Sequence, residues 1–119
     1  MSKKVLIIDD EEGIRESLKL ILSEHYEIIL TDGGEQALQV LENAKDVGVA
    51  LLDIKMRKVH GLDVLKEIKE KHPKVKVLMV TGYKSVETAS EAAQLGASGY
   101  IVKPFRAEEI LETVKKNLK

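Results

Sequence analysis

The stretch Val49-Ala50-Leu51-Leu52-Asp53 decides how the rest of the chain is interpreted. Four apolar residues lead directly into one carboxylate, and a basic loop follows. A short apolar run with these boundaries is typical of a strand that is buried on both faces. Residues 49–53 are therefore predicted to form a strand of a parallel sheet, with Asp53 at its carboxyl end. Ligands bind at that edge of open α/β sheets, so Asp53 is the first candidate for a functional residue.

Composition indicates one soluble globular domain. The chain has 119 residues, 44% of them hydrophobic, and we expect a single domain over residues 1–119. A net charge of −1 argues against direct nucleic-acid binding by this domain. The absence of Cys excludes disulfides and thiol catalysis. The first apolar run, Val5 to Ile8, is too short for a signal peptide or a membrane span, so we expect a cytoplasmic protein without membrane contact.

Apolar runs typical of strands alternate along the chain with apolar residues at helical spacing. Strands are predicted at 5–8, 27–30, 49–53, 75–80 and 100–102, and helices around 14–22, 37–41, 62–72, 85–94 and 110–118. This alternation predicts an α/β fold, with helices on both faces of a five-stranded parallel sheet. We expect the doubly wound, flavodoxin-like order 2-1-3-4-5, because only five strands are predicted and the βα turns lack the G-x-G-x-x-G fingerprint.

Polar residues stand at the carboxyl ends of four predicted strands. They are Asp9-Asp10, Asp53, Thr81-Gly82 and Lys103-Pro104. Carboxylates about 4 Å apart repel by roughly 1 kcal/mol in water, so a proton or a cation must join them. Oxygen ligands without His or Cys favour Mg²⁺. A nucleophilic Asp, a metal ion and a Lys are the parts needed for phosphoryl transfer.

Each of these residues also has a purely structural interpretation. Asp10 alone is equally well explained as the cap of the first helix. Thr81 could be a turn residue, Lys103 a loop residue and Asp53 an exposed carboxylate. The functional interpretation depends on the four groups together, because chance rarely arranges them at four strand ends of one sheet.

Four motifs resemble the receiver domain of two-component response regulators, the CheY-like family. They are Val5-Leu-Ile-Ile-Asp-Asp-Glu-Glu12, Leu51-Leu-Asp-Ile-Lys-Met56, Val80-Thr-Gly-Tyr83 and Tyr100-Ile-Val-Lys-Pro-Phe105. They follow the family's order and spacing, and the resemblance covers essentially the whole chain. Residues 81–97 are also similar to the receivers of NtrC-type transcriptional activators, which favours transcription regulation as the output.

The resemblance implies how a phosphoryl group would be accepted. Asp53 would take it from the phosphohistidine of a sensor histidine kinase. The side chains of Asp10 and Asp53, with the backbone carbonyl of Lys55, would hold Mg²⁺, and Asp9 would act mainly through water. The domain would catalyse only its own phosphorylation and dephosphorylation, so it would not be an enzyme acting on other molecules.

The resemblance also implies how the signal would leave the site. Thr81 and Lys103 would bind phosphoryl oxygens. Thr81 and Tyr100 would form a switch pair, in which the hydroxyl moves toward the phosphate and the ring turns inward. A cis peptide is expected before Pro104.

The predicted helix 85–94 is the candidate moving part, because it is rich in Ala and carries little apolar surface. With the strand 100–102 and the last helix it would form a face for homodimerisation or for an output domain or partner protein. Two alternatives stay open: an interaction domain that works without phosphate, and an aspartate-nucleophile phosphatase. The second lacks support, because the chain shows neither a cap domain nor a spaced acid pair.

The loop after the third predicted strand departs from the family pattern. Arg57 stands in place of the usual Pro, and Lys55, Lys58 and His60 add to its basic character. It is either a drifted surface loop or a source of positive potential that steers an anionic donor. In the family, the positions of Lys55 and Tyr83 influence the lifetime of the phosphate.

Overall fold

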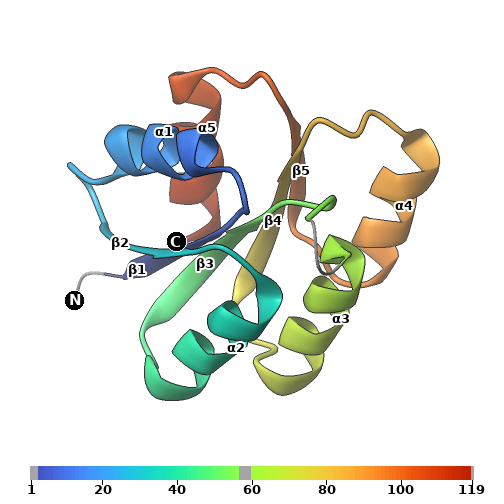
Figure 1. The fold of residues 1–119 in the computed structure, drawn as a ribbon, viewed down its shortest axis with the longest axis horizontal. Coiled ribbons are helices and arrows are strands. Elements are labelled where there is room, and N and C mark those ends of the chain that lie inside the picture. The colour runs from blue at the N-terminus through green and yellow to red at the C-terminus, as the bar shows by residue number, and fades with distance from the viewer. Residues whose placement is uncertain (1–2, 57–59, 119) are drawn as a thin grey trace.

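A parallel sheet lies between two layers of helices in the computed structural model, which describes residues 3–56 and 60–118 (Figure 1). In chain order the elements are β1 (Lys4–Ile8), α1 (Glu12–Leu22), β2 (Glu27–Thr31), α2 (Gly34–Asn43), β3 (Val47–Leu52), α3 (Gly61–Lys71), β4 (Lys76–Thr81), α4 (Val86–Gln94), β5 (Gly99–Val102) and α5 (Ala107–Asn117). Strands and helices alternate as the hydrophobic pattern predicts. Within the described ranges, no helix combines the length and apolar character needed to cross a membrane.

The strand order is β2-β1-β3-β4-β5, and all neighbouring strands are parallel. The predicted doubly wound order is therefore confirmed. The central strand, β3, begins at Val47, two residues before the predicted start, and ends at Leu52, so Asp53 lies just beyond it. The early start was missed because Gly48 interrupts the apolar run, and the pairing of β3 with β1 is irregular at this point.

Alternate residues of the strands build two separate cores. Strand residues of the first core are Val5, Ile7, Val49, Leu51, Leu78, Val80 and Ile101, packed with α1 and α5. Strand residues of the second are Leu6, Ile8, Val47, Ala50, Leu52, Val77 and Met79, packed with α2, α3 and α4. Figure 1 shows the same division of the helices between the two faces. Because both faces are covered, the strands consist of continuous apolar runs, and only the sheet edges remain for polar chemistry.

Helix α4 has the weakest attachment to the sheet. It buries one residue, Ala92, whereas each of the other helices buries two to five, and its first residue, Val86, is 88% exposed. Its ends are nevertheless well defined. The Ser85 hydroxyl accepts a hydrogen bond from the Thr88 amide (3.2 Å), and Gly96 follows the helix with φ +104°, a conformation that favours glycine.

We predict that amide hydrogens of α4 exchange at least about tenfold faster than those of α3 in the unphosphorylated domain. The two helices have similar lengths, 9 and 11 residues, but opening α4 exposes far less apolar surface. Hydrogen exchange followed by mass spectrometry of peptide fragments measures the difference. Equal protection of residues 87–94 and 64–71 would contradict this prediction.

Candidate functional site

The carboxyl ends of β1, β3, β4 and β5 lie next to one another at one edge of the sheet. Backbone hydrogen bonds continue past the strands: the Asp53 amide donates to the Ile8 carbonyl (3.1 Å), and the Lys103 amide donates to the Thr81 carbonyl (2.8 Å). The peptide bond between Lys103 and Pro104 is cis, as expected. The edge therefore gathers the predicted site residues from four separate parts of the chain.

Three carboxylates form a cluster at this edge. One oxygen from each of Asp9, Asp10 and Asp53 lies within 4.8 Å of the others. Asp9 and Asp53 are only 2% and 5% exposed, and Asp10 is half-buried. The Asp53 carboxylate has a defined orientation, because its Oδ1 accepts a hydrogen bond from the Ile54 amide (2.8 Å). Closely spaced oxygen ligands without His or Cys suit Mg²⁺, so this donor set fits the ion that the resemblance implies.

Lys103 brings a positive charge to the cluster. Its Nζ donates a hydrogen bond to Asp9 Oδ2 (2.9 Å) and lies 3.5 Å from Asp53 Oδ2 and 3.6 Å from Glu11 Oε1. Burial alone would lower the pKa of Lys103. The hydrogen bond and charge of Asp9, with the charges of Asp53 and Glu11, outweigh that effect and raise the pKa above its usual value. The ammonium therefore stays charged between the carboxylates.

The direct pairing of Lys103 with Asp9 and its approach to Glu11 were not predicted from the sequence. The acidic run Asp9-Asp10-Glu11 was the available signal. Asp9 Oδ1 accepts a hydrogen bond from the Glu11 amide (2.9 Å). This bond turns the chain so that both residues 9 and 11 reach the same ammonium.

Burial raises the pKa of the Asp53 carboxyl above its usual value. The negative charge of Asp9 adds to this rise, whereas the charge of Lys103 and hydrogen bonds from Thr81 and Ile54 offset part of it. The ionised form of Asp53 is therefore disfavoured in the metal-free cluster. A divalent cation among these carboxylates would favour the ionised form, which is the nucleophile.

Tyr83 connects Thr81 with Tyr100. The Tyr83 amide donates to Thr81 Oγ1 (3.2 Å), and the Tyr100 hydroxyl donates to the Tyr83 carbonyl (2.6 Å). Lys55 Nζ lies 4.5 Å from the centroid of the Tyr83 ring, within the range of a cation–π interaction. The loop after β3, the loop after β4 and strand β5 are therefore joined through one residue.

The starts of α1 and α3 show which residues cap these helices. The N-cap residue of α1 is Glu11 rather than Asp10, and its side chain makes no capping hydrogen bond. His60 is the N-cap of α3, where its Nδ1 accepts an amide hydrogen bond from that helix (3.3 Å). Arg57 and Lys58, on which the hypothesis of a basic steering loop depends, lie outside the described residues.

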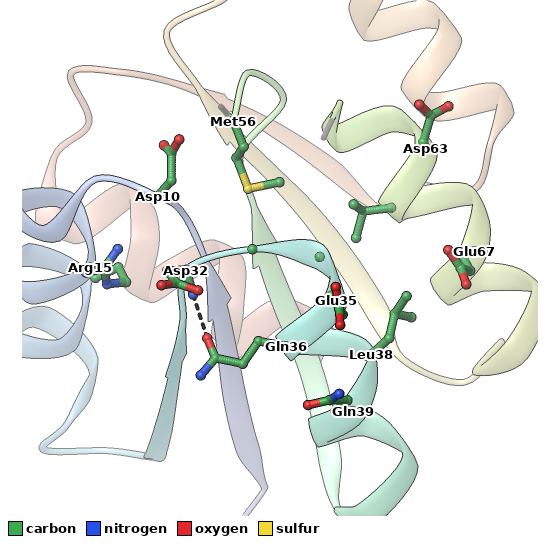
Figure 2. Close-up of a pocket in the computed structure, with 13 residues that line it drawn as sticks. Asp10, Arg15, Asp32, Glu35, Gln36, Leu38, Gln39, Met56, Asp63 and Glu67 are labelled. Atoms are coloured by element: carbon green, nitrogen blue, oxygen red, sulfur yellow. Dashed lines mark hydrogen bonds between the residues drawn. The ribbon is translucent and has the colours of Figure 1, made fainter. Parts of the chain in front are cut away.

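An open pocket adjoins the carboxylate cluster on the side of α2 and α3, with Asp10 and Met56 at its border (Figure 2). Carboxylates from both helices and from the loop after β2 line it: Asp32, Glu35, Asp63 and Glu67. Arg15 also lines the pocket, and its Nη1 donates to the Asp9 carbonyl (2.8 Å). The pocket thus extends the negative surface around the cluster, and Arg15 supports the loop that carries Asp9 and Asp10.

A family model for the response regulator receiver domain matches residues 5–115. The chain belongs to this family. Receiver domains of two-component response regulators are phosphorylation-controlled signalling domains and are not enzymes acting on external substrates. Such domains generally bind Mg²⁺ at an acidic pocket and interact with histidine kinases and output domains.

Similar receivers occur alone and within longer regulators. The chain is 34% identical to sporulation initiation phosphotransferase F of Bacillus subtilis, covering 99% of this chain and 95% of that protein. It is 35% identical to the response regulator protein FleR of Pseudomonas aeruginosa and 38% identical to the transcriptional regulatory protein ZraR of Escherichia coli. The match covers 98% and 96% of this chain but only 25% of FleR and 26% of ZraR. Such relatives support the likeness to receivers of NtrC-type regulators.

Solved receiver structures have the same fold. A CheY-like receiver domain protein from Methanospirillum hungatei superposes with a TM-score of 0.94 at 35% identity, covering 99% of this receiver and 94% of that chain. NtrX from Brucella abortus superposes with a TM-score of 0.91 at 33% identity, covering 99% of this receiver and 27% of that chain.

We predict that Asp53→Asn raises the free energy of unfolding by about 1 kcal/mol at pH 7 without divalent ions, because it removes one charge from a repelling carboxylate cluster. Asn retains the oxygen that accepts from the Ile54 amide. Since folding raises the pKa of Asp53, its ionisation destabilises the native state fully above the folded-state pKa and not at all below the unfolded-state pKa. The advantage of the variant should therefore disappear as the pH falls through that window.

Urea unfolding across pH measures this difference, with Asp32→Asn as the control for an exposed carboxylate at the same edge. Added Mg²⁺ should stabilise the native chain more than Asp53→Asn, because it binds the folded cluster. A variant that is less stable than the native chain at pH 7 would show that repulsion does not dominate the cluster.

Proposed function

We propose that residues 1–119 form one receiver domain in which Asp53 accepts a phosphoryl group from a sensor histidine kinase, in a Mg²⁺-dependent reaction in the cytoplasm. The observation that supports this best is the position of Asp53. It is nearly fully buried, yet its carboxylate lies within 4.8 Å of two further carboxylates and 3.5 Å from an ammonium. Carboxylates without a functional role usually lie on the surface, where water solvates their charge.

Residues of the chain have distinct parts in the transfer. The Asp53 carboxylate attacks phosphorus, so a P–O bond forms while the P–N bond of the phosphohistidine breaks and the imidazole leaves as a neutral ring after taking up a proton. Lys103 shifts from Asp9 toward the phosphoryl oxygens, and the Thr81 hydroxyl donates to another of them. Asp10, Asp53 and the Lys55 carbonyl would hold Mg²⁺, with Asp9 acting through water, and the ion would supply charge neutralisation. Water reverses the modification by hydrolysing the acyl phosphate.

The output follows from the added charge. Phosphorylation takes Asp53 from about −1 toward −2 and adds acceptor oxygens. To move the domain from about 1% to 99% active, the phosphate must favour the active form by roughly 5.5 kcal/mol, which charge-assisted hydrogen bonds to Lys103 and Thr81 and the metal can together provide.

The change is relayed from Thr81 through Tyr83 to Tyr100, and from there to the surface of α4, β5 and α5. The contacts at 3.2 and 2.6 Å provide a continuous connection, and α4 is the helix with the fewest buried residues. This surface would then bind a second copy of the domain or an output partner that regulates transcription.

We predict that incubation with a small phosphodonor and Mg²⁺ adds one phosphoryl group to the native chain and none to Asp53→Asn. Intact-mass spectrometry detects the adduct, and Asp32→Asn, a change of another Asp at the same edge, should be modified like the native chain. Omission of Mg²⁺ should reduce the rate at least about a hundredfold, since transfer to a clustered carboxylate requires charge neutralisation.

The result distinguishes the proposed switch from its alternatives. An adduct on Asp53→Asn would place the acceptor elsewhere. If the native chain shows no adduct and no binding of beryllofluoride, a fast self-hydrolysis is excluded and the domain works without phosphate. Turnover of an external phosphate ester that requires Asp53 would instead identify a phosphatase.

We predict that Tyr100→Phe leaves the phosphorylation rate within about twofold but reduces the phosphorylation-induced change in α4 by at least about half. The substitution removes one hydrogen bond, of about 0.5–1.5 kcal/mol, and keeps the ring. Hydrogen exchange of α4 with and without phosphate measures the change, and Tyr26→Phe, in a residue that packs on the core of α1 and α5, is the control. A response of native size in Tyr100→Phe would exclude the relay through Tyr83.

A further inference from the structure

Gly61, the first residue of α3, makes an unusually close contact with the peptide group that follows Asp53. It is buried, and its amide donates to the Ile54 carbonyl (2.6 Å). A Cβ built on Gly61 would lie 2.0 Å from the Asp53 carbonyl oxygen and 2.6 Å from Ile54 Cα. Both are backbone atoms, so no side-chain rotation can relieve the overlap.

Proximity, not conformation, explains the glycine at this position. Among the glycines of the described chain, Gly96 alone has a positive φ, so residue 61 does not need the conformational freedom of glycine. The close approach of the backbone excludes a side chain at this position. In any other residue the distance between Cβ and the Asp53 carbonyl oxygen must increase from 2.0 Å to at least 3.0 Å, so the start of α3 must move away from the peptide 53–54.

The peptide group between Asp53 and Ile54 helps to orient the Asp53 carboxylate. The Ile54 amide orients the Asp53 carboxylate through Oδ1, and Oδ2 lies toward Lys103. The following residue, Lys55, pairs with His60 in an isolated antiparallel bridge, so its backbone also depends on where α3 begins. A displacement of about 1 Å at a reacting group can cost on the order of a hundredfold in rate.

We propose that Gly61 is a positioning residue of this receiver: the missing side chain lets α3 lie against the Asp53 peptide and so sets the geometry of the Mg²⁺ and phosphoryl site. This inference rests on the proposed function of Asp53. Gly61 touches neither metal nor phosphate, and acts only through the backbone of residues 53–55.

The test compares Gly61→Ala with two matched substitutions. Gly33→Ala adds a methyl group at the same edge of the sheet, where nothing lies within 4 Å. Gly48→Ala produces an overlap elsewhere, in β3, where the new Cβ would lie 2.4 Å from Leu118 Cδ2, a side-chain end that can move more easily than the backbone at Gly61. The Mg²⁺ affinity of each folded domain is measured by calorimetry and by the NMR shifts of the amides of Ile54 and Lys55, and stability is measured by urea unfolding.

Gly61→Ala should weaken Mg²⁺ binding at least about tenfold and slow phosphorylation by a small phosphodonor by about a hundredfold. Gly33→Ala and Gly48→Ala should bind Mg²⁺ within about twofold of the native chain, even if Gly48→Ala loses stability. If Gly61→Ala is partly unfolded, the comparison is made in sucrose, which favours the compact state.

Native Mg²⁺ affinity and phosphorylation in folded Gly61→Ala would overturn the inference and leave the proposed function intact. A Gly61→Ala chain that stays unfolded in sucrose while Gly48→Ala folds would also overturn it, because the glycine would then serve folding and not the site. A native chain that neither binds Mg²⁺ nor accepts a phosphoryl group would instead reject the proposed function itself, and the inference with it.

Discussion

The carboxylate edge of this receiver depends on the ammonium of Lys103, which lies between two buried carboxylates. Asp9 and Asp53 are almost fully buried, and buried charges are tolerated only when they are paired. Lys103 meets this need from the far end of the chain, since residues 9 and 103 are joined only by the parallel arrangement of β1, β3, β4 and β5. Within the described residues, the Lys103 ammonium lies close to three acids at once: Asp9, Glu11 and Asp53. The closely spaced oxygens of Asp9, Asp10 and Asp53 make this edge a suitable place for a divalent cation.

The two cores of the sheet leave this edge free for chemistry. Each strand packs on both of its faces, so the apolar residues fix the positions of the strand ends, and the polar residues follow at the first position outside the core. The site residues come together because the four loops that carry them begin next to one another. The register of the parallel strands fixes these starting points.

Much of this arrangement could be predicted from the sequence. The apolar runs before Asp9, Asp53 and Thr81 identify strands and place those side chains at one edge, because a buried parallel strand has a clear signature. The ion-pair partners of the site residues could not be predicted. A pattern of strand ends does not say that Lys103 bonds to Asp9 more closely than to Asp53. The contacts between Lys55 and Tyr83 and between Gly61 and the Asp53 peptide were also not predicted. They are made by loops, and hydrophobic periodicity gives no information on the path of a loop.

The scarcity of aromatic residues gives the position of Tyr83 and Tyr100 a spectroscopic meaning. The chain has three Tyr, one Phe and no Trp, so tyrosine dominates its ultraviolet emission. The Tyr100 hydroxyl donates a hydrogen bond to the Tyr83 backbone carbonyl, and the Lys55 ammonium lies over the Tyr83 ring. Emission from tyrosine is sensitive to hydrogen bonding of the phenol and to nearby charge. The receiver therefore carries an intrinsic, label-free optical reporter at the contact between the loop after β4 and strand β5.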